Sequence, residues 1–222
     1  MNRDQRVVYP IAAVVLSVIF ASFLIGELYS SVSALNSSFE PWLNVLIINM
    51  VIGILSLLFI RSIREQFQKF AKGFRYYVPG LIVLFGSLFL AIMFRSPSVS
   101  GDRHELYFSL FSITLIPIFE EIVYRGLVFE LLANQMKSHW RIYIGAIIFS
   151  FVHTMPTFAH LVRMEIGLPI GPFLLGLVCG WLVDKSGSLW PAIVFHCAGN
   201  CTVLIFSWLS PDWLDKLSVF YL

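Results

Sequence analysis

Three ionisable side chains lie within one long apolar stretch of the sequence, where charged residues are rare. Glu120, Glu121 and Arg125 all fall inside residues 117–125. On insertion scales, a charge at the centre of a membrane helix costs on the order of 2.5–3.5 kcal/mol, so such a residue usually faces the protein interior and serves a function. Along an α-helix, Glu121 and Arg125 share a face one turn apart, whereas Glu120 points about 100° away from Glu121. We therefore expect Glu121 to pair with Arg125, which leaves Glu120 available for chemistry.

Two histidines and an asparagine lie in later apolar stretches. His153 follows Phe149 by four residues and His196 precedes Asn200 by four, so each pair shares a helical face. With a rise of about 1.5 Å per residue, Glu120, His153 and Asn200 lie roughly 17–18 Å from the predicted cytoplasmic ends of their helices, and His196 lies roughly 10 Å from its own. We expect these four side chains to converge on one site between the membrane centre and the cytoplasmic face.

Such a group of side chains suits two kinds of chemistry. In the first, Glu120 is a general base that activates water, the two histidines hold the water or stabilise the transition state, and Asn200 donates to a developing oxyanion. In the second, Glu120, His153 and His196 bind a divalent metal such as zinc. The residue types and their spacing leave both open.

The composition indicates which elements position these side chains. Of 222 residues, 58% are hydrophobic and 13% are charged, and the mean hydropathy is +0.83. The apolar runs are long and continuous, as in membrane-spanning helices. Apart from Arg125, the fifteen Lys and Arg residues lie near the ends of these runs, and the net charge is only +2, so we expect no nucleic-acid partner. The fold class predicted is an all-α polytopic transmembrane helix bundle in a lipid bilayer, without a large soluble domain.

The apolar runs place about seven spans, with six or eight as alternatives. A span of the hydrocarbon core takes roughly 20 helical residues. The sixth run is short and contains three glycines, so a tilted or broken helix is expected there. The predicted spans are residues 7–28, 42–60, 77–94, 106–132, 142–160, 169–183 and 189–209.

We expect residues 1–105 to form three N-terminal transmembrane helices with a basic cytoplasmic loop at 61–76. Residues 106–210 form the catalytic helical core, and 211–222 form a C-terminal tail. Lys and Arg gather on one side of the spans, which predicts a cytoplasmic N-terminus by the positive-inside rule. Phenylalanines interrupt the basic stretch 61–75, so it is either an amphipathic segment on the inner leaflet or a solvated loop. Gly176 and Gly180, four residues apart, predict close helix packing.

Three motifs on successive predicted helices resemble those of the CPBP family, the CAAX proteases and bacteriocin-processing enzymes also called the Abi family. The resemblance covers residues 106–209. The motifs are Glu120-Glu121-x-x-x-Arg125, Phe149-x-x-x-His153 and His196-x-x-x-Asn200.

The resemblance implies an integral, multi-pass intramembrane endopeptidase that acts on a membrane-associated protein or peptide, either CAAX-like or leader-like. It also implies that Glu120 and His153 activate the attacking water, and that His196 and Asn200 stabilise the tetrahedral oxyanion. Glu121 and Arg125 would be supporting residues. Use of a metal is disputed within the family. A short chain of this kind fits a bacterial plasma membrane and peptide processing.

Two functions from other classes compete with this interpretation. The first is a non-enzymatic immunity or scaffold protein, in which the polar cluster is a packing core. The second is a proton-coupled transporter, because acids and histidines also form proton relays. The sequence shows no inverted repeat and no paired broken helices, which argues against a transporter.

Overall fold

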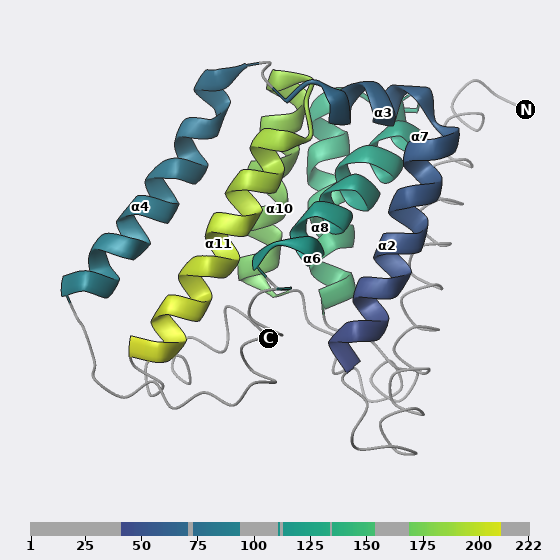
Figure 1. The fold of residues 1–222 in the computed structure, drawn as a ribbon. Coiled ribbons are helices and arrows are strands. Elements are labelled where there is room, and N and C mark those ends of the chain that lie inside the picture. Colours follow the sequence, from purple (N-terminus) through teal and green to yellow (C-terminus); the bar gives the residue numbers. More distant parts are fainter. Residues whose placement is uncertain are drawn as a thin grey trace, which may run out of the picture.

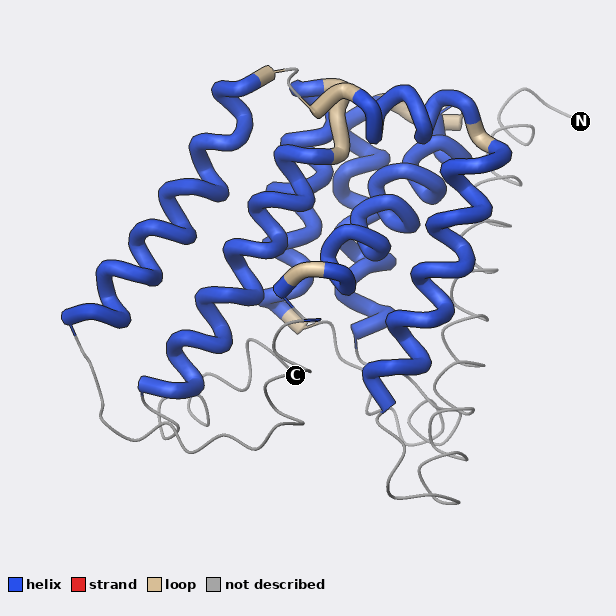
Figure 2. Tube along the Cα trace, in the orientation of Figure 1, coloured by secondary structure: helices blue, strands red, loops and turns tan. Residues whose placement is uncertain are grey.

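The computed structural model describes residues 41–70, 73–93, 111, 113–133, 135–153 and 169–209. Within these ranges the chain is almost entirely helical and contains no strand, which confirms the all-α prediction (Figure 2). The elements are α2 (Pro41–Phe59), α3 (Arg61–Gln68), η1 (Phe74–Tyr77), α4 (Val78–Met93), α6 (Leu115–Glu121), η2 (Ile122–Val128), α7 (Phe129–Ala133), α8 (Ser138–His153), α10 (Ile170–Ser186) and α11 (Trp190–Leu209).

The long apolar runs agree well with the observed helices. α2, α4 and α11 begin and end within one residue of the second, third and seventh predicted spans. α10 is a continuous helix that extends three residues beyond the sixth predicted span, so no break occurs there. The first predicted span and the tail at 211–222 lie outside the described residues.

In the described part of the chain, no single helix combines the length and apolar character needed to cross a membrane. One bent pair does so jointly, namely residues 46–59 of α2 together with α3, which meet at 100°.

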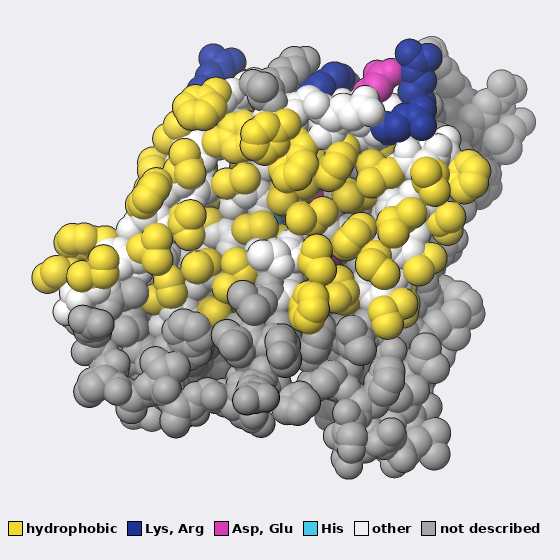
Figure 3. Space-filling model, viewed as in Figure 1, with side chains coloured by type: hydrophobic (Ala, Val, Ile, Leu, Met, Phe, Trp, Pro, Cys, Tyr) yellow, Lys and Arg dark blue, Asp and Glu magenta, His cyan; other side chains and the backbone are white. Residues whose placement is uncertain are grey.

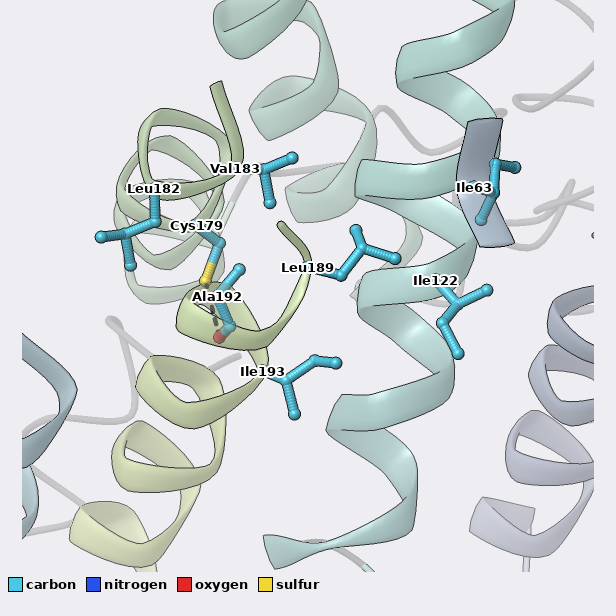
Figure 4. Packing of buried hydrophobic residues seen from close by; sticks show 8 residues of the cluster. All are labelled: Ile63, Ile122, Cys179, Leu182, Val183, Leu189, Ala192 and Ile193. Carbon is cyan, nitrogen blue, oxygen red and sulfur yellow. Dashed lines mark hydrogen bonds between the residues drawn. The ribbon is translucent and has the colours of Figure 1, made fainter. Parts of the chain in front are cut away.

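The helix that carries the two glutamates lies inside the bundle. Figure 1 shows α6 running between α11 and α2, with α4 on the outer side of α11. α10 packs against both α8 and α11. One core cluster joins these elements (Figure 4), and its buried members are Ile63, Ile122, Cys179, Leu182, Val183, Leu189, Ala192 and Ile193.

Two glycines permit a close contact between helices α10 and α8. A Cβ on Gly176 would lie 2.9 Å from the Cα of Ala146, and one on Gly180 would lie 3.0 Å from Phe129 Cζ of α7 and 3.2 Å from Ile142 Cγ2. Ala146 and Ile142 belong to α8. The predicted close packing through Gly176 and Gly180 is therefore confirmed, and α8 is its partner.

The fourth predicted span differs from expectation in its backbone. We predicted one α-helix over 106–132, but residues 122–128 form a π-helical turn between α6 and α7. π-turns inside α-helices often occur at functional sites. The 100° step per residue assumed for Glu121 and Arg125 therefore does not hold beyond Glu121, although the two side chains still meet.

The basic stretch 61–75 begins with a helix, α3, that lies across one end of the bundle (Figure 1). Its Ile63 is fully buried, and Ile63 Cγ2 lies 2.9 Å from the Cβ position of Gly126 in η2. Arg61 and Arg64 on the other side of α3 are exposed. Residues 61–68 thus form an amphipathic helix, and its apolar side contacts η2, which continues the helix that carries the glutamates.

Candidate active site

The two glutamates occupy the last two positions of α6, where the π-turn begins. Glu120 is 6% exposed, and the Glu121 and Arg125 side chains are 0% and 1% exposed. Arg125 Nη1 donates to Glu121 Oε1 at 2.9 Å. The ion pair predicted from the spacing is therefore present, and it is fully buried.

One imidazole ring connects both carboxylates. His196 Nδ1 lies 2.8 Å from Glu121 Oε1, and His196 Nε2 lies 3.6 Å from Glu120 Oε2. His196 belongs to α11 and is itself buried, so this contact spans two helices. The sequence did not predict this bridge, in which both glutamates contact His196.

The positions of the protons in this group follow from which atoms can donate and which can only accept. An ionised carboxylate only accepts hydrogen bonds, so Glu121 Oε1 receives one from Arg125 and one from the Nδ1–H of His196. A neutral His196 then carries a lone pair on Nε2, whereas its imidazolium form donates Nε2–H toward Glu120. His196 is thus able to exchange a proton on the Glu120 side while Glu121 fixes its orientation.

Phe149 is the apolar centre of the site, and the sequence analysis gave it no chemical role beyond its place in the Phe149-x-x-x-His153 motif. Its side chain is fully buried on α8. The Arg125 guanidinium carbon lies 4.2 Å from the ring centroid, and the His196 ring meets the phenyl ring edge-on at 5.6 Å. Tyr124 also packs against this ring, at 5.1 Å. The Phe149-x-x-x-His153 spacing was the only sequence signal that pointed to it.

His153 reaches the site through the same phenylalanine. It is the last residue of α8 and is exposed. Its ring lies 4.3 Å from the Phe149 ring, and its Nδ1 lies 2.6 Å from the Phe149 carbonyl oxygen. Because a carbonyl oxygen only accepts, Nδ1 carries the proton, which leaves Nε2 as the basic nitrogen of a neutral ring.

Asn200 lies one turn after His196 on α11 and is half-buried. The structure therefore brings Glu120, Glu121, Arg125 and His196 into direct contact and connects His153 to them through Phe149. Asn200 remains a candidate by its position on the His196 helix.

A metal centre needs at least three ligands directed at one point. Within the described residues, no group of three His, Cys, Asp or Glu side chains is arranged to hold a metal ion. His196 uses Nδ1 for Glu121 and His153 uses Nδ1 for the Phe149 carbonyl, which leaves Nε2 of both rings free, as in metal-ligating histidines. The metal set Glu120, His153 and His196 stays a prediction, and we derive no step through a metal.

Comparison with known families assigns this region of the chain. Residues 102–202 match the family model for type II CAAX prenyl endopeptidases, Rce1-like. This segment contains α6 to α10, the first part of α11 and all three motifs, and it matches the CPBP family. Its members are integral membrane helical bundles with protease activity. Searches of curated proteins and of solved structures gave no significant match.

Proposed function

We propose that this protein is an intramembrane endopeptidase that hydrolyses a peptide bond of a membrane-associated substrate by water activated through glutamate and histidine. The observation that carries the proposal is the buried His196 ring between two carboxylates, 3.6 Å from Glu120 and 2.8 Å from Glu121. Charged groups buried in this way are costly and mark functional sites in membrane proteins.

In the proposed reaction, Glu120 removes a proton from a water molecule as the water oxygen attacks the scissile carbonyl carbon. His153 holds the same water through Nε2. The π electrons of the C=O bond move to oxygen and give a tetrahedral oxyanion, to which the His196 imidazolium and the Asn200 amide donate hydrogen bonds. The oxyanion then re-forms the C=O bond as the C–N bond breaks, and Glu120 returns its proton to the leaving amine, which regenerates the Glu120 carboxylate.

Glu121 and Arg125 position His196 in this scheme. Arg125 donates to Glu121, and Glu121 accepts Nδ1–H of His196 so that Nε2 faces the reacting atoms. This arrangement has the logic of the buried acid that orients a catalytic histidine in hydrolases. Glu121 is therefore a positioning residue, while Glu120 is the proposed base.

The family supports a prenylated, membrane-associated protein as the substrate class. We extend this to a CAAX-like or leader-like peptide segment held near the site, in a bacterial plasma membrane with the N-terminus in the cytoplasm. The alternative is a non-enzymatic immunity or scaffold protein. The buried Glu121–Arg125 ion pair is the observation that favours this alternative, because such a pair also fixes helix packing.

The test is hydrolysis of a quenched fluorescent peptide panel, prenylated and unprenylated, by the purified full chain in detergent. Glu120→Gln should lower the rate at least about 100-fold, the usual contribution of a general base. Glu130→Gln, on the same continuous helical segment, is the matched control and should retain activity. Thermal unfolding of both variants checks the fold.

Equal activity of Glu120→Gln and wild type would refute the proposal. A folded wild type that cleaves no member of the panel would favour the scaffold function. A chelator added to the active enzyme separates the two chemistries: loss of activity that returns with zinc would assign a metal, while unchanged activity would assign glutamate alone.

A further inference from the structure

The end of the bundle covered by α3 and η1 carries a surface that combines exposed cations with exposed aromatic rings. We call residues 61–70 and 73–77 the arm. Arg61, Arg64 and Arg75 of the arm are exposed, and Lys69 is half-buried. Phe70 and Phe74 are 59% and 76% exposed. Figure 3 shows Lys and Arg at this end of the molecule, directly above a broad hydrophobic face.

The geometry of the arm is that of a helix in the plane of an interface. α3 turns 100° away from α2, so it lies across the bundle axis rather than along it. An amphipathic helix with basic residues on its polar side and aromatic residues beside it is typical of the headgroup region of a bilayer. The exposed apolar side chains of α2 and α4 begin immediately beside the arm, among them Phe59, Val78 and Ile82.

The arm is held rigidly to the rest of the protein. The indole Nε1 of Trp190 donates to the Phe67 carbonyl at 2.5 Å, and the Phe67 and Trp190 ring centroids are 4.9 Å apart. Phe70 packs against Trp190 at 5.0 Å, and the Tyr77 hydroxyl donates to the Phe70 carbonyl. The cations are therefore presented on a fixed frame rather than on a free loop.

Acidic groups nearby offset only part of the positive charge of this surface. Glu65 is the only acid among the described residues of the arm, and it pairs with Arg61 at 2.7 Å. Asp184, at the same end of α10, is already shared by Lys185 at 3.1 Å and Arg141 at 3.8 Å. Arg64 donates to the Leu58 carbonyl at the end of α2, and Arg75 lies over the Tyr76 ring, yet both remain open to an incoming anion.

We propose that the arm binds the headgroups of anionic phospholipids in the leaflet at this end of the bundle. The three arginines contact the lipid phosphates, for which the planar guanidinium is suited. Phe70 and Phe74 enter the adjacent acyl region. Charge complementarity selects the lipid, because a zwitterionic headgroup offers the cations no net attraction.

The experiment measures lipid retention by the full chain in detergent micelles with native mass spectrometry. The probes are phosphatidylglycerol and phosphatidylcholine with identical acyl chains. Wild type should retain phosphatidylglycerol preferentially, and rising salt should weaken this preference, because the headgroup interaction is screened. The variant R61Q/R64Q/R75Q should bind phosphatidylglycerol about fivefold more weakly for each arginine removed, with phosphatidylcholine binding unchanged.

Two further variants make the result decisive. R61K/R64K/R75K keeps the charges and should retain most of the preference. K137Q/R141Q/K185Q removes three cations that lie at the same end of the bundle but outside the arm, and should leave the preference intact. Any of three outcomes would overturn the proposal. Wild type could retain both lipids equally, the preference could persist in R61Q/R64Q/R75Q, or K137Q/R141Q/K185Q could lose the preference to the same extent. Retained phosphatidylcholine binding shows that each variant is folded.

Discussion

The chain contains two arginine–glutamate pairs at the same helical spacing in opposite surroundings. Arg61 and Glu65 on α3 lie 2.7 Å apart with side chains 84% and 45% exposed. Glu121 and Arg125 lie 2.9 Å apart with side chains 0% and 1% exposed. Their distances are nearly equal, so the difference between them is one of burial and neighbours.

Burial decides what each pair does. An exposed pair typically contributes less than about 1 kcal/mol, because water screens it and its side chains lose entropy. A buried charge is costly unless every partner is present, so removing one member is strongly destabilising. The buried pair also holds a third group, the His196 imidazole, whereas the exposed pair leaves arginine donors open. The same two residue types therefore belong to the proposed active site in one region and to the proposed lipid-binding surface in the other.

The largest difference is expected when each arginine is neutralised. Arg125→Gln leaves Glu121 buried without its cation and should lower the free energy of unfolding by about 3–5 kcal/mol, with loss of peptidase activity. Arg61→Gln should cost less than about 1 kcal/mol and leave activity unchanged. Unfolding by SDS titration in mixed micelles measures both.

A control distinguishes lost pairing from lost packing against Phe149. The double variant Glu121→Gln/Arg125→Gln removes both charges, so it should be more stable than Arg125→Gln alone. If Arg125→Gln and Arg61→Gln cost the same, burial does not separate the two pairs and the comparison fails.

An intermediate effect is expected where the two regions touch. Gly126→Ala places a Cβ 2.9 Å from Ile63 Cγ2, so α3 or η2 has to shift, at a cost of about 1–3 kcal/mol. Gly86→Ala on α4 is the matched control, because nothing lies within 4 Å of its Cβ position. It should be neutral or stabilising by up to about 1 kcal/mol.

Shortening the neighbour tests whether this contact is the cause. In Gly126→Ala/Ile63→Ala the clash is absent, so the cost should fall below the sum of the two single variants. Peptidase assays of Gly126→Ala show whether a displacement of the arm reaches Glu120. Additive costs would mean that Ile63 and Gly126 are energetically independent.

The sequence predicted what depends on composition and on spacing within one helix. Long apolar runs gave α2, α4 and α11 to within one residue, and the four-residue spacing gave the Glu121–Arg125 pair. The sequence did not predict the contacts between helices. The His196 bridge to both glutamates requires α11 to cross α6 at one height, which helix periodicity does not encode.

The π-turn and the role of Phe149 were not predicted either, because both depend on the folded structure rather than on residue type. The π-turn at 122–128 changes the register of a helix whose residue types are ordinary for an α-helix. Its place in a motif does not tell the contacts of Phe149, one of 21 phenylalanines in the chain. The structure shows that it packs against Arg125, His153 and His196. The catalytic roles of Glu120, His153, His196 and Asn200 remain predictions that the activity assays address.

The smallest effect concerns the exposed pair and its response to pH. The hydrogen bond from Arg61 and its positive charge hold the pKa of Glu65 below the ordinary value of 4.5. A carboxyl with a lowered folded-state pKa contributes stability above its unfolded pKa, and that contribution is lost as the pH falls through the folded pKa. The Arg61–Glu65 pair should therefore be intact at neutral pH and weaken only below about pH 4.5. Carboxyl NMR titration of wild type and Arg61→Gln measures this, and the variant should move the Glu65 pKa back toward 4.5. An unchanged Glu65 pKa in Arg61→Gln would show that the other cations of the arm, Arg64 and Lys69, set this pKa. The Arg61–Glu65 pair would then make no separate contribution.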